Sequence, residues 1–424
     1  MDGYNLAMPQ GSGIATYGHT LLEAANRLGL GTQVLYGPTN RISSIAEVNE
    51  AEIISGHAKS RRKSVGRAIS TYTSRFGVKA YPVVSTGRVK WPRAGMRQPM
   101  ASQYWMAREL YHLAHRAYAR NGTFAKVNFA TADGATMPSV MHWTCPLPIT
   151  ARGVPNILTV HDVIPIMLPH STADNKSLFY RLLDEACHRA DHILSVSETT
   201  KIDLVRLFPD LEPRISVSYQ PVFKPEPVAQ EDVARWLKDT INLDYGDYFL
   251  FYGAIEPKKN LGRIVEAYLD SGSQRPLVIV GGRQWLHEHE IGLLNAYLTE
   301  QPDPRIIRLD FLSRSSLERL IRGARATLFP SLYEGFGLPV LESMALGVPV
   351  LGSYEGAIAE VGAEAILGVD PYDTASISVG IRKLDRDDEL RLGLSLAGTA
   401  RAEFFSPSKY SDSLMTIYQN FNLL

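Results

Sequence analysis

Cysteine is scarce in this sequence. Only Cys145 and Cys187 occur among 424 residues, too few for a disulfide framework, and their spacing is not that of a metal site. This usage is typical of a reducing compartment, so we expect a cytoplasmic protein, with peripheral attachment to the inner face of the cytoplasmic membrane left open. Long apolar runs are also missing: no stretch of about 18 residues could span a membrane, and residues 1–13 lack the features of a signal peptide.

Net charge is absent as well, because 44 Lys and Arg residues balance 44 Asp and Glu residues. Such a balance argues against a nucleic-acid binder only if the charges are evenly distributed. They are not: residues 56–126 hold fifteen basic residues and one acid, Glu109, which gives this basic segment a formal charge of +14. An anionic partner therefore stays open for this segment alone.

The pattern of apolar residues predicts an α/β fold. Hydrophobic residues make up 45% of the chain and charged residues 21%, as in ordinary globular proteins. Short, continuous apolar runs alternate with helical patterns, which favours parallel strands covered by helices on both faces. Strands are expected at 32–36, 157–160, 192–196, 215–219, 248–252, 277–280, 306–309, 326–329 and 349–351, and helices at 18–28, 178–190, 261–269, 315–322 and 339–345.

A proline-dense stretch, residues 221–227, is the best candidate for a linker. It divides the chain into halves of similar size, each with its own alternating pattern. We therefore expect two doubly wound, Rossmann-like domains, 1–222 and 223–405, followed by a helical segment, 406–424. Ligands of such sheets lie beyond the carboxyl ends of the strands, so the two domains would face a shared cleft.

The most informative segment is Phe329-Pro330-Ser331-Leu332-Tyr333-Glu334-Gly335-Phe336-Gly337-Leu338-Pro339-Val340-Leu341-Glu342. A strand ends near Pro330, a glycine-rich loop follows, and Pro339 suits the first turn of a helix. The loop 334–338 therefore presents backbone N–H groups at a helix N-terminus, which is a natural anion site. Glu334 and Glu342 flank that site and suit a ligand with a phosphate and sugar hydroxyls; the alternative is a capping loop with two solvated glutamates.

A second loop lies between a strand that ends at Gly253 and a helix that begins near Leu261. It carries Lys258 and Lys259. Lysines at a strand-to-helix turn can clamp a diphosphate, although a solvated basic turn is the commoner explanation of such a pair taken alone.

Two weaker signals lie in the first half. Residues 11–13, Gly-Ser-Gly, precede a helical pattern, and glycines let a backbone approach a phosphate closely, but a flexible turn is equally compatible. His161 and Asp162 end an apolar strand, where α/β enzymes place reactive groups; the alternative is a hydrogen-bonded turn. Residues 287–289, His-Glu-His, look like metal ligands, but neighbours at i and i+2 on a helix do not face one another, so no metal is expected.

Together these segments resemble the retaining, nucleotide-sugar-dependent glycosyltransferases of family 4, which have the GT-B fold. They are most similar to a bacterial subgroup that includes many mannosyltransferases of polysaccharide and lipopolysaccharide assembly. The matching segments are 334–342 for the family's E-x7-E signature, 256–260 for the subgroup's E-P-R-K-N, 160–162 for V-H-D and 196–201 for V-S-x-x-T-K. The resemblance covers residues 150–375, is patchy in 1–40 and is absent from 41–140.

The resemblance implies roles for the matching residues. Glu334 would contact the donor sugar near its anomeric carbon, and His161 would bind that sugar from the N-terminal domain. Lys259 would neutralise the leaving diphosphate, which Gly13 would approach, and Glu342 would bind the ribose hydroxyls. Backbone amides for the sugar and phosphate would come from Phe336, Gly337 and Leu338.

At other positions the sequence matches the family pattern only in part. The segment ending at Leu312, after Asp310 and Phe311, lies where the family reads the base. Many members have an arginine after the glycine that corresponds to Gly253; here Ala254 takes that position, so Lys258 is expected to supply the second positive charge. The family's usual Pro-Glu pair is Ala359-Glu360 here, which leaves Glu360 without an assigned role. The family's last helix often crosses back to the first domain, as 406–424 would.

The implied activity is metal-independent, retaining transfer of a hexose. A nucleoside diphosphate is already a good leaving group, so no carboxylic acid donor is needed, and no cofactor is expected beyond the nucleotide sugar. Mannose from GDP-mannose is the expected donor, by analogy with the subgroup. The alternatives are a UDP-sugar, a GT-B-type epimerase or phosphorylase, for which no pyridoxal-phosphate lysine site is found, and a non-catalytic protein that binds anionic lipid or RNA.

The basic segment falls in the domain that usually handles the acceptor, a saccharide or polyprenyl-diphosphate-linked saccharide. Its basic residues are interleaved with Tyr72, Phe76, Tyr81, Trp91, Tyr104 and Trp105. This mixture suits contact with an anionic membrane or a diphosphate-linked lipid, and no nucleic acid is expected. A solvated basic face with ordinary core aromatics is the equally weighted alternative.

Overall fold

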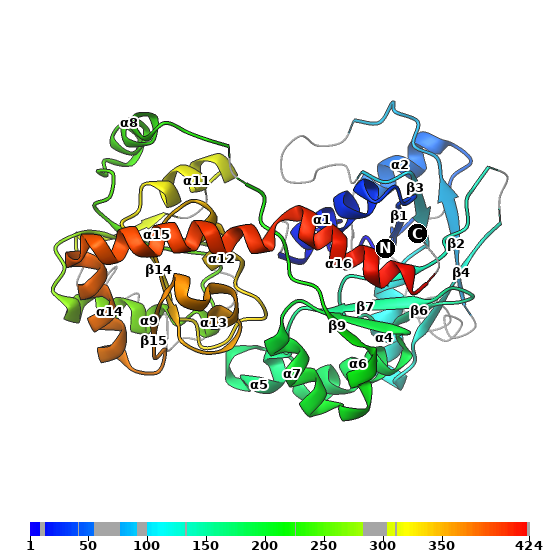
Figure 1. Ribbon diagram of the computed structural model, residues 1–424. Coiled ribbons are helices and arrows are strands. Elements are labelled where there is room, and N and C mark those ends of the chain that lie inside the picture. Colours follow the sequence, from blue (N-terminus) through cyan, green and yellow to red (C-terminus); the bar gives the residue numbers. More distant parts are fainter. Residues whose placement is uncertain are drawn as a thin grey trace.

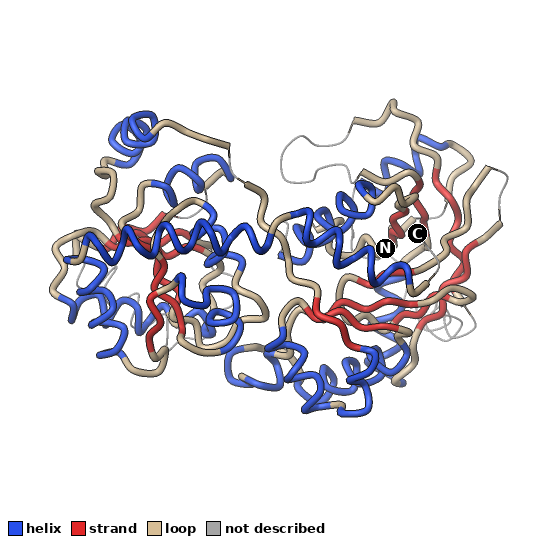
Figure 2. The backbone as a smooth tube through the Cα atoms, viewed as in Figure 1, coloured by secondary structure: helices blue, strands red, loops and turns tan. Residues whose placement is uncertain are grey.

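The chain forms two α/β lobes joined at their waist (Figure 1). The computed structural model describes residues 1–8, 13–40, 42–54, 77–90, 100–131, 134–224, 226–282, 303–309 and 312–421. Strands lie inside each lobe and helices cover them (Figure 2). Of the helices within these ranges, none is long and apolar enough to cross a membrane.

The N-terminal lobe holds two sheets, with strand orders β1-β3-β2-β4-β6 and β5-β7-β8-β9. The strands are β1 (Gln33–Tyr36), β2 (Val78–Val83), β3 (Gln103–Met106), β4 (Ala125–Phe129), β5 (Met141–Trp143), β6 (Ile149–Ala151), β7 (Asn156–Val160), β8 (His192–Ser195) and β9 (Ile215–Val217). Asp2 connects the sheets, because it forms a parallel bridge with Leu35 of β1 and donates its amide to the His142 carbonyl of β5 at 3.2 Å.

The expectation of parallel pairing is wrong for one pair of strands, since β2 and β3 run antiparallel. The sequence pattern of β2 explains the difference. Exposed Lys79 and Tyr81 flank buried Ala80, so one face of the strand is open to solvent. Antiparallel sheets tolerate such one-sided exposure, whereas parallel strands are normally covered on both faces.

Helices of the N-terminal lobe pack on both sheets. They are α1 (Gly13–Arg27), α2 (Ala46–Ile54), α4 (Leu110–Asn121), α5 (Ile164–Met167), α6 (Lys176–Arg189) and α7 (Glu198–Leu207). Helix α7 begins where it does because Ser197 is its N-cap: the serine side chain accepts a hydrogen bond from the Thr200 amide at 3.0 Å.

The C-terminal lobe has one parallel sheet of order β12-β11-β10-β13-β14-β15. Its strands are β10 (Phe249–Tyr252), β11 (Leu277–Val280), β12 (Ile306–Leu309), β13 (Ala326–Phe329), β14 (Val350–Ser353) and β15 (Leu367–Val369). Its helices are α8 (Gln230–Ile241), α9 (Leu261–Ser271), α11 (Arg314–Arg322), α12 (Leu338–Ala345), α13 (Gly356–Gly362), α14 (Thr374–Arg386) and α15 (Asp388–Ala402).

Both lobes also contain short 3-10 turns. Those of the N-terminal lobe are η2 (Pro169–Ser171) and η3 (Pro209–Arg214), and those of the C-terminal lobe are η4 (Pro257–Lys259), η6 (Ala363–Ala365) and η7 (Glu403–Phe405).

The last helix, α16 (Pro407–Gln419), returns to the N-terminal lobe. It continues the direction of α15 across the waist and packs beside α1 (Figure 1). Tyr418 of α16 is hydrogen-bonded to His142 Nδ1 at 2.9 Å inside that lobe. The buried cores follow this path: apart from Val196, one core uses residues 233–405, whereas Tyr410 and Leu414 belong to a core of the first lobe.

Candidate active site

Lys259 and Glu334 form an ion pair at the carboxyl edge of the C-terminal sheet. Lys259 ends η4, after β10, and Glu334 lies in the loop between β13 and α12. Because β10 and β13 are neighbouring parallel strands, the loops that follow them meet at one edge. The Lys259 ammonium contacts Glu334 Oε1, and the two side chains are only 12% and 10% exposed. The pair joins two motifs that lie far apart in the sequence.

Nearby charges keep the Glu334 carboxylate ionised. Burial alone would raise the pKa of Glu334, but Lys259 and then Lys258 hold it below the ordinary carboxyl value. Burial likewise opposes the charge of Lys258, but Glu334, Asp162 and Glu256 together raise its pKa above the ordinary lysine value. The Lys258 ammonium lies 3.3 Å from Glu256 Oε2. The side chains of Lys258 and Lys259 therefore both act on the Glu334 carboxylate.

The start of α12 lies next to this pair. Gly337 is its N-cap with φ of 107°, a left-handed conformation that favours glycine, and no side chain caps the helix there. The backbone amides of Leu338 and the next residues therefore lie at the start of a helix, near two lysines. Such an arrangement favours the binding of an anion. The ring of Phe336 points elsewhere: it is buried and packs on Phe405, with centroids 5.7 Å apart, so only its backbone serves this loop.

His161 approaches from the N-terminal lobe, directly after β7. Its Nε2 lies 2.9 Å from the Thr144 carbonyl oxygen, and a carbonyl can only accept, so the neutral ring carries its proton on Nε2. The ring also meets the edge of Tyr17, with centroids 4.8 Å apart. Burial lowers the pKa of His161 to about 4. The imidazole is therefore neutral at physiological pH, and Nδ1 is left as an acceptor.

Asp162 is mainly a turn residue. Its Oδ1 accepts a hydrogen bond from the Ile164 amide at 3.1 Å, at the start of α5. This is the hydrogen-bonded turn that the sequence offered as the alternative. The carboxylate also acts on Lys258, whose pKa it helps to raise.

The lobes touch at Gly335, between the motifs. Its carbonyl oxygen accepts hydrogen bonds from Ser197 Oγ at 2.7 Å and Thr200 Oγ1 at 3.2 Å. A Cβ atom at Gly335 would lie 2.0 Å from the His161 carbonyl oxygen, so only glycine lets the loops come this close. The structure thus brings His161 and the Glu334 loop together across the lobes.

Glu342 lies on α12 and pairs with Arg314, whose Nη1 is 2.7 Å from Glu342 Oε1. Arg314 is the first residue of α11 and follows Leu312 by two residues. The segment that ends at Leu312 therefore leads directly to the residue that contacts Glu342. Asp310 and Phe311 lie outside the described residues. The sequence analysis missed Arg314, although a basic residue just after the segment expected to read the base was an available signal.

Two of the expected glycines are less informative. Gly253 follows β10 with φ of 135°, which favours glycine and turns the chain toward Lys258 and Lys259. Gly13 begins α1 and is exposed, while residues 11–12 of its motif lie outside the described residues. The His-Glu-His segment at 287–289 also lies outside them.

Two further contacts near the site involve residues that belong to no motif recognised in the sequence. Tyr333, beside Glu334, donates its hydroxyl to Asp203 of α7 in the other lobe. Thr144, which orients His161, is itself held by Asp2, since its hydroxyl donates to Asp2 Oδ1 at 3.1 Å. Both are tertiary contacts between distant residues.

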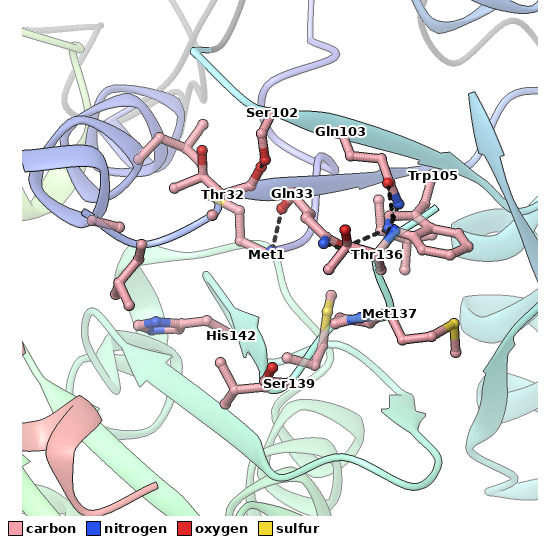
Figure 3. Close-up of a pocket in the computed structure, with 18 of the residues that line it drawn as sticks. Met1, Thr32, Gln33, Ser102, Gln103, Trp105, Thr136, Met137, Ser139 and His142 are labelled. Carbon is pink, nitrogen blue, oxygen red and sulfur yellow. Dashed lines mark hydrogen bonds between the residues drawn. The ribbon is translucent and has the colours of Figure 1, made fainter. Parts of the chain in front are cut away.

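A cavity of about 520 Å³ lies elsewhere, inside the N-terminal lobe (Figure 3). Gln33, Gln103 and Met141 line it at the first residues of β1, β3 and β5, whereas the candidate site lies at the carboxyl ends of strands. It is therefore separate from the site. Trp105 borders it and donates to Gln33 Oε1 at 2.7 Å. Trp105 and Tyr104 are 1% and 2% exposed, so these two aromatics belong to the core and not to a membrane-facing surface.

The pKa of His161 leads to a prediction. We expect kcat/KM to stay level between pH 7 and pH 5, because a ring whose pKa is lowered to about 4 remains neutral over that range. Initial rates at saturating acceptor and low donor would measure this profile, with His161→Asn as the reference that lacks the titrating ring. A fall in kcat/KM below about pH 6.5 that is absent from His161→Asn would contradict the prediction that His161 is neutral over this range.

Comparison with known proteins identifies the family. Residues 237–401 match the family described as "Glycosyl transferases group 1". O-antigen chain mannosyltransferase B of Escherichia coli is 30% identical over 278 residues, which cover 62% of this chain and 70% of that protein. The chain belongs to the group 1 glycosyltransferases. O-antigen chain mannosyltransferase RfbU of Salmonella typhimurium is 28% identical over 229 residues, which cover 54% of this glycosyltransferase and 60% of that one.

Solved structures show the fold. The Anabaena protein HepE, in complex with UDP and glucose, aligns with a TM-score of 0.63 at 12% identity and covers 97% of both chains. Sucrose-phosphate synthase from Thermosynechococcus elongatus aligns with a TM-score of 0.62 at 14% identity, over 99% of this chain and 97% of that one. The glycosyltransferase therefore has the GT-B fold, as the resemblance implied. Its relatives also confirm the bacterial mannosyltransferase-like character.

Proposed function

We propose that this glycosyltransferase moves mannose from GDP-mannose to a saccharide or a polyprenyl-diphosphate-linked saccharide, with retention, in polysaccharide or lipopolysaccharide assembly. The largely buried Lys259–Glu334 pair near the start of α12 carries the proposal, because it places positive and negative charge where a sugar diphosphate needs both. The names of the two O-antigen mannosyltransferases support mannose as the sugar and its assembly context.

In this proposal the C-terminal lobe holds the donor. Lys259, Lys258 and the first amides of α12 bind the diphosphate, and Glu342 binds the ribose hydroxyls after exchanging its contact with Arg314. The base lies beside Leu312. The Glu334 carboxylate faces the sugar near the anomeric carbon, and His161 accepts a hydrogen bond from a sugar hydroxyl at Nδ1.

Transfer then needs charge stabilisation rather than an acid. The bond between the anomeric carbon and the β-phosphate oxygen breaks with its electron pair on that oxygen, where Lys259 and Lys258 stabilise the added negative charge. Glu334 stabilises the positive charge that develops on the sugar. The acceptor oxygen bonds to the anomeric carbon on the face the phosphate leaves, and its proton passes to the departing phosphate oxygen. Closure of the lobes excludes water and limits hydrolysis.

Metal independence and base preference give one combined prediction. We expect initial rates to be unchanged by EDTA, because two lysines and helix amides already supply the positive charge at the diphosphate. We also expect GDP to raise the thermal midpoint of unfolding more than UDP does at equal concentration. A nucleotide present at 100 times its Kd stabilises the folded protein by about 2.7 kcal/mol. Loss of activity in EDTA that Mg²⁺ restores would contradict the first part, and a larger shift with UDP the second.

The basic segment is proposed to meet the anionic acceptor or its membrane. Its described basic residues include exposed Lys79, Arg88 and Lys90 around β2, and Arg88 is paired with Glu47 at 3.0 Å. Exposed Tyr81 of the same strand is the aromatic neighbour that stays outside the core. Tyr72, Phe76 and Trp91 lie outside the described residues.

A further inference from the structure

Glu360 makes contacts across the lobes that the roles above do not use. It belongs to α13 in the C-terminal lobe, but its carboxylate reaches the start of α7 in the N-terminal lobe. Oε1 accepts the Glu198 amide at 2.6 Å, and Oε2 accepts the Thr199 amide at 2.9 Å and the Thr199 hydroxyl at 2.7 Å. One carboxylate therefore receives three hydrogen bonds from the opposite lobe.

These contacts divide the capping of α7 between the lobes. The first amides of a helix have no partner within it, and the helix dipole favours negative charge there. Ser197 satisfies the Thr200 amide from within the N-terminal lobe, while Glu360 satisfies the Glu198 and Thr199 amides from the other lobe. Two of the first amides of α7 therefore depend on the opposite lobe for their hydrogen-bond acceptor.

The same helix holds the loop around Glu334. Thr200 donates to the Gly335 carbonyl, and Asp203 accepts from Tyr333, so α7 contacts the residues on both sides of Glu334. The hydrogen bonds between the lobes therefore extend from Glu360 to the residues next to Glu334. Figure 1 shows α7 and α13 facing each other at the junction of the lobes.

The helix that carries Glu360 is held from behind. Arg401 of α15 donates Nη2 to the Glu360 carbonyl at 2.8 Å and Nε to the Val361 carbonyl at 3.0 Å. Its guanidinium also lies over the ring of Phe405, 5.0 Å from the centroid, where the chain crosses to α16. The backbone of α13 at Glu360 is therefore held by α15, close to the point where the chain crosses to the other lobe.

We propose that Glu360 is a positioning residue, a cap supplied by one lobe to a helix of the other, which fixes lobe closure and so aligns Glu334 with His161 for transfer. The proposal rests on the proposed function for its kinetic consequences, but the capping itself concerns closure. The contacts of the Glu360 carboxylate lie at the start of α7, away from Lys258 and the Lys259–Glu334 pair.

Kinetics of Glu360→Ala and Glu360→Gln test the role. We expect Glu360→Ala to lower kcat about tenfold, by loss of the cap, while GDP affinity stays within about twofold, because the proposed nucleotide contacts all lie in the C-terminal lobe. Glu360→Gln keeps an acceptor but loses the charge, so it should fall between Glu360→Ala and wild type. Glu364→Ala, at an exposed glutamate of the neighbouring η6, is the matched control and should match wild type. A kcat within twofold of wild type, or GDP affinity falling in parallel with kcat, would overturn the role.

A double-variant cycle and a scattering measurement complete the test. Thr199→Val removes the hydroxyl donor, so its effect on kcat should vanish in the Glu360→Ala background; additive losses would overturn the capping contact. By small-angle X-ray scattering, Glu360→Ala should have a larger radius of gyration than wild type and Glu364→Ala. Equal radii would overturn the closure role. Because scattering needs no substrate, it separates failure of the cap from failure of the proposed transfer.

Discussion

Replacing Glu334 by glutamine is expected to lower kcat by about 10²–10³-fold, the range seen when one electrostatic contact to a transition state is removed. The buried carboxylate is held ionised by Lys259 and Lys258, so glutamine removes a full negative charge from the place where positive charge develops on the sugar. Release of nucleotide in the presence of acceptor measures the loss. Near-normal turnover in a folded Glu334→Gln protein would contradict the assignment.

Stability must be separated from activity in this experiment. Breaking a buried ion pair by removing one partner costs about 3–5 kcal/mol, because the other charge is left without compensation. We therefore expect Glu334→Gln and Lys259→Met each to lower the thermal midpoint, and the double variant to regain much of it while remaining inactive. A double variant that recovers activity together with stability would show that the pair is structural only.

Gly335→Ala is expected to lower kcat by about 10²-fold, because misplacing a reacting group by about 1 Å has that effect. The new Cβ would lie 2.0 Å from the His161 carbonyl oxygen and 3.0 Å from Asp162 Cβ, so the two lobes must separate at this point. The substitution does not strain the backbone of Gly335 itself, since its φ lies outside the left-handed region. Transfer rates, with circular dichroism to check the fold, measure the effect.

Gly262→Ala is the matched control for this substitution. Gly262 lies in α9, has no heavy atom within 4 Å of an added Cβ, and has an ordinary φ. Alanine there should leave kcat unchanged and stabilise the helix by about 0.5–1 kcal/mol. If Gly335→Ala behaves as Gly262→Ala does, the close contact between the lobes is not needed for turnover.

The sequence predicted five of the six strands of the C-terminal lobe and missed β15, which is three residues long and partly exposed. The expected bounds 277–280, 306–309 and 326–329 agree with β11, β12 and β13. For β11 and β13 this agreement comes from runs that are buried on both faces, whereas β12 contains Arg308 and is only partly buried. The Lys259 and Glu334 loops were equally readable, because glycine, proline and charge combine there at strand ends.

The N-terminal lobe was harder to predict. Strands β2 to β6 were missed, and β2 has alternating exposure while β5 and β6 are three residues long, which is too short for a periodic signal. The aromatics of the basic segment show the same problem. Composition cannot tell a surface Tyr81 from a core Trp105, because burial depends on which face of the sheet each occupies.

Contacts between the lobes were beyond sequence reasoning. Glu360 was noticed only as a departure from a family pattern, and Tyr333 and Asp203 belong to separate segments joined only in the fold. Such pairs require the distance between elements, which a single sequence does not contain.

The most direct test of the central claim is the release of GDP from GDP-mannose by the wild-type protein, with a polyprenyl-diphosphate-linked saccharide as acceptor and EDTA present. We predict GDP release equal to the mannose transferred, an α-linked product from the α-linked donor, and transfer by Glu334→Gln that is about 10²–10³-fold slower. Transfer that is undiminished in Glu334→Gln, or a β-linked product, would contradict the claim.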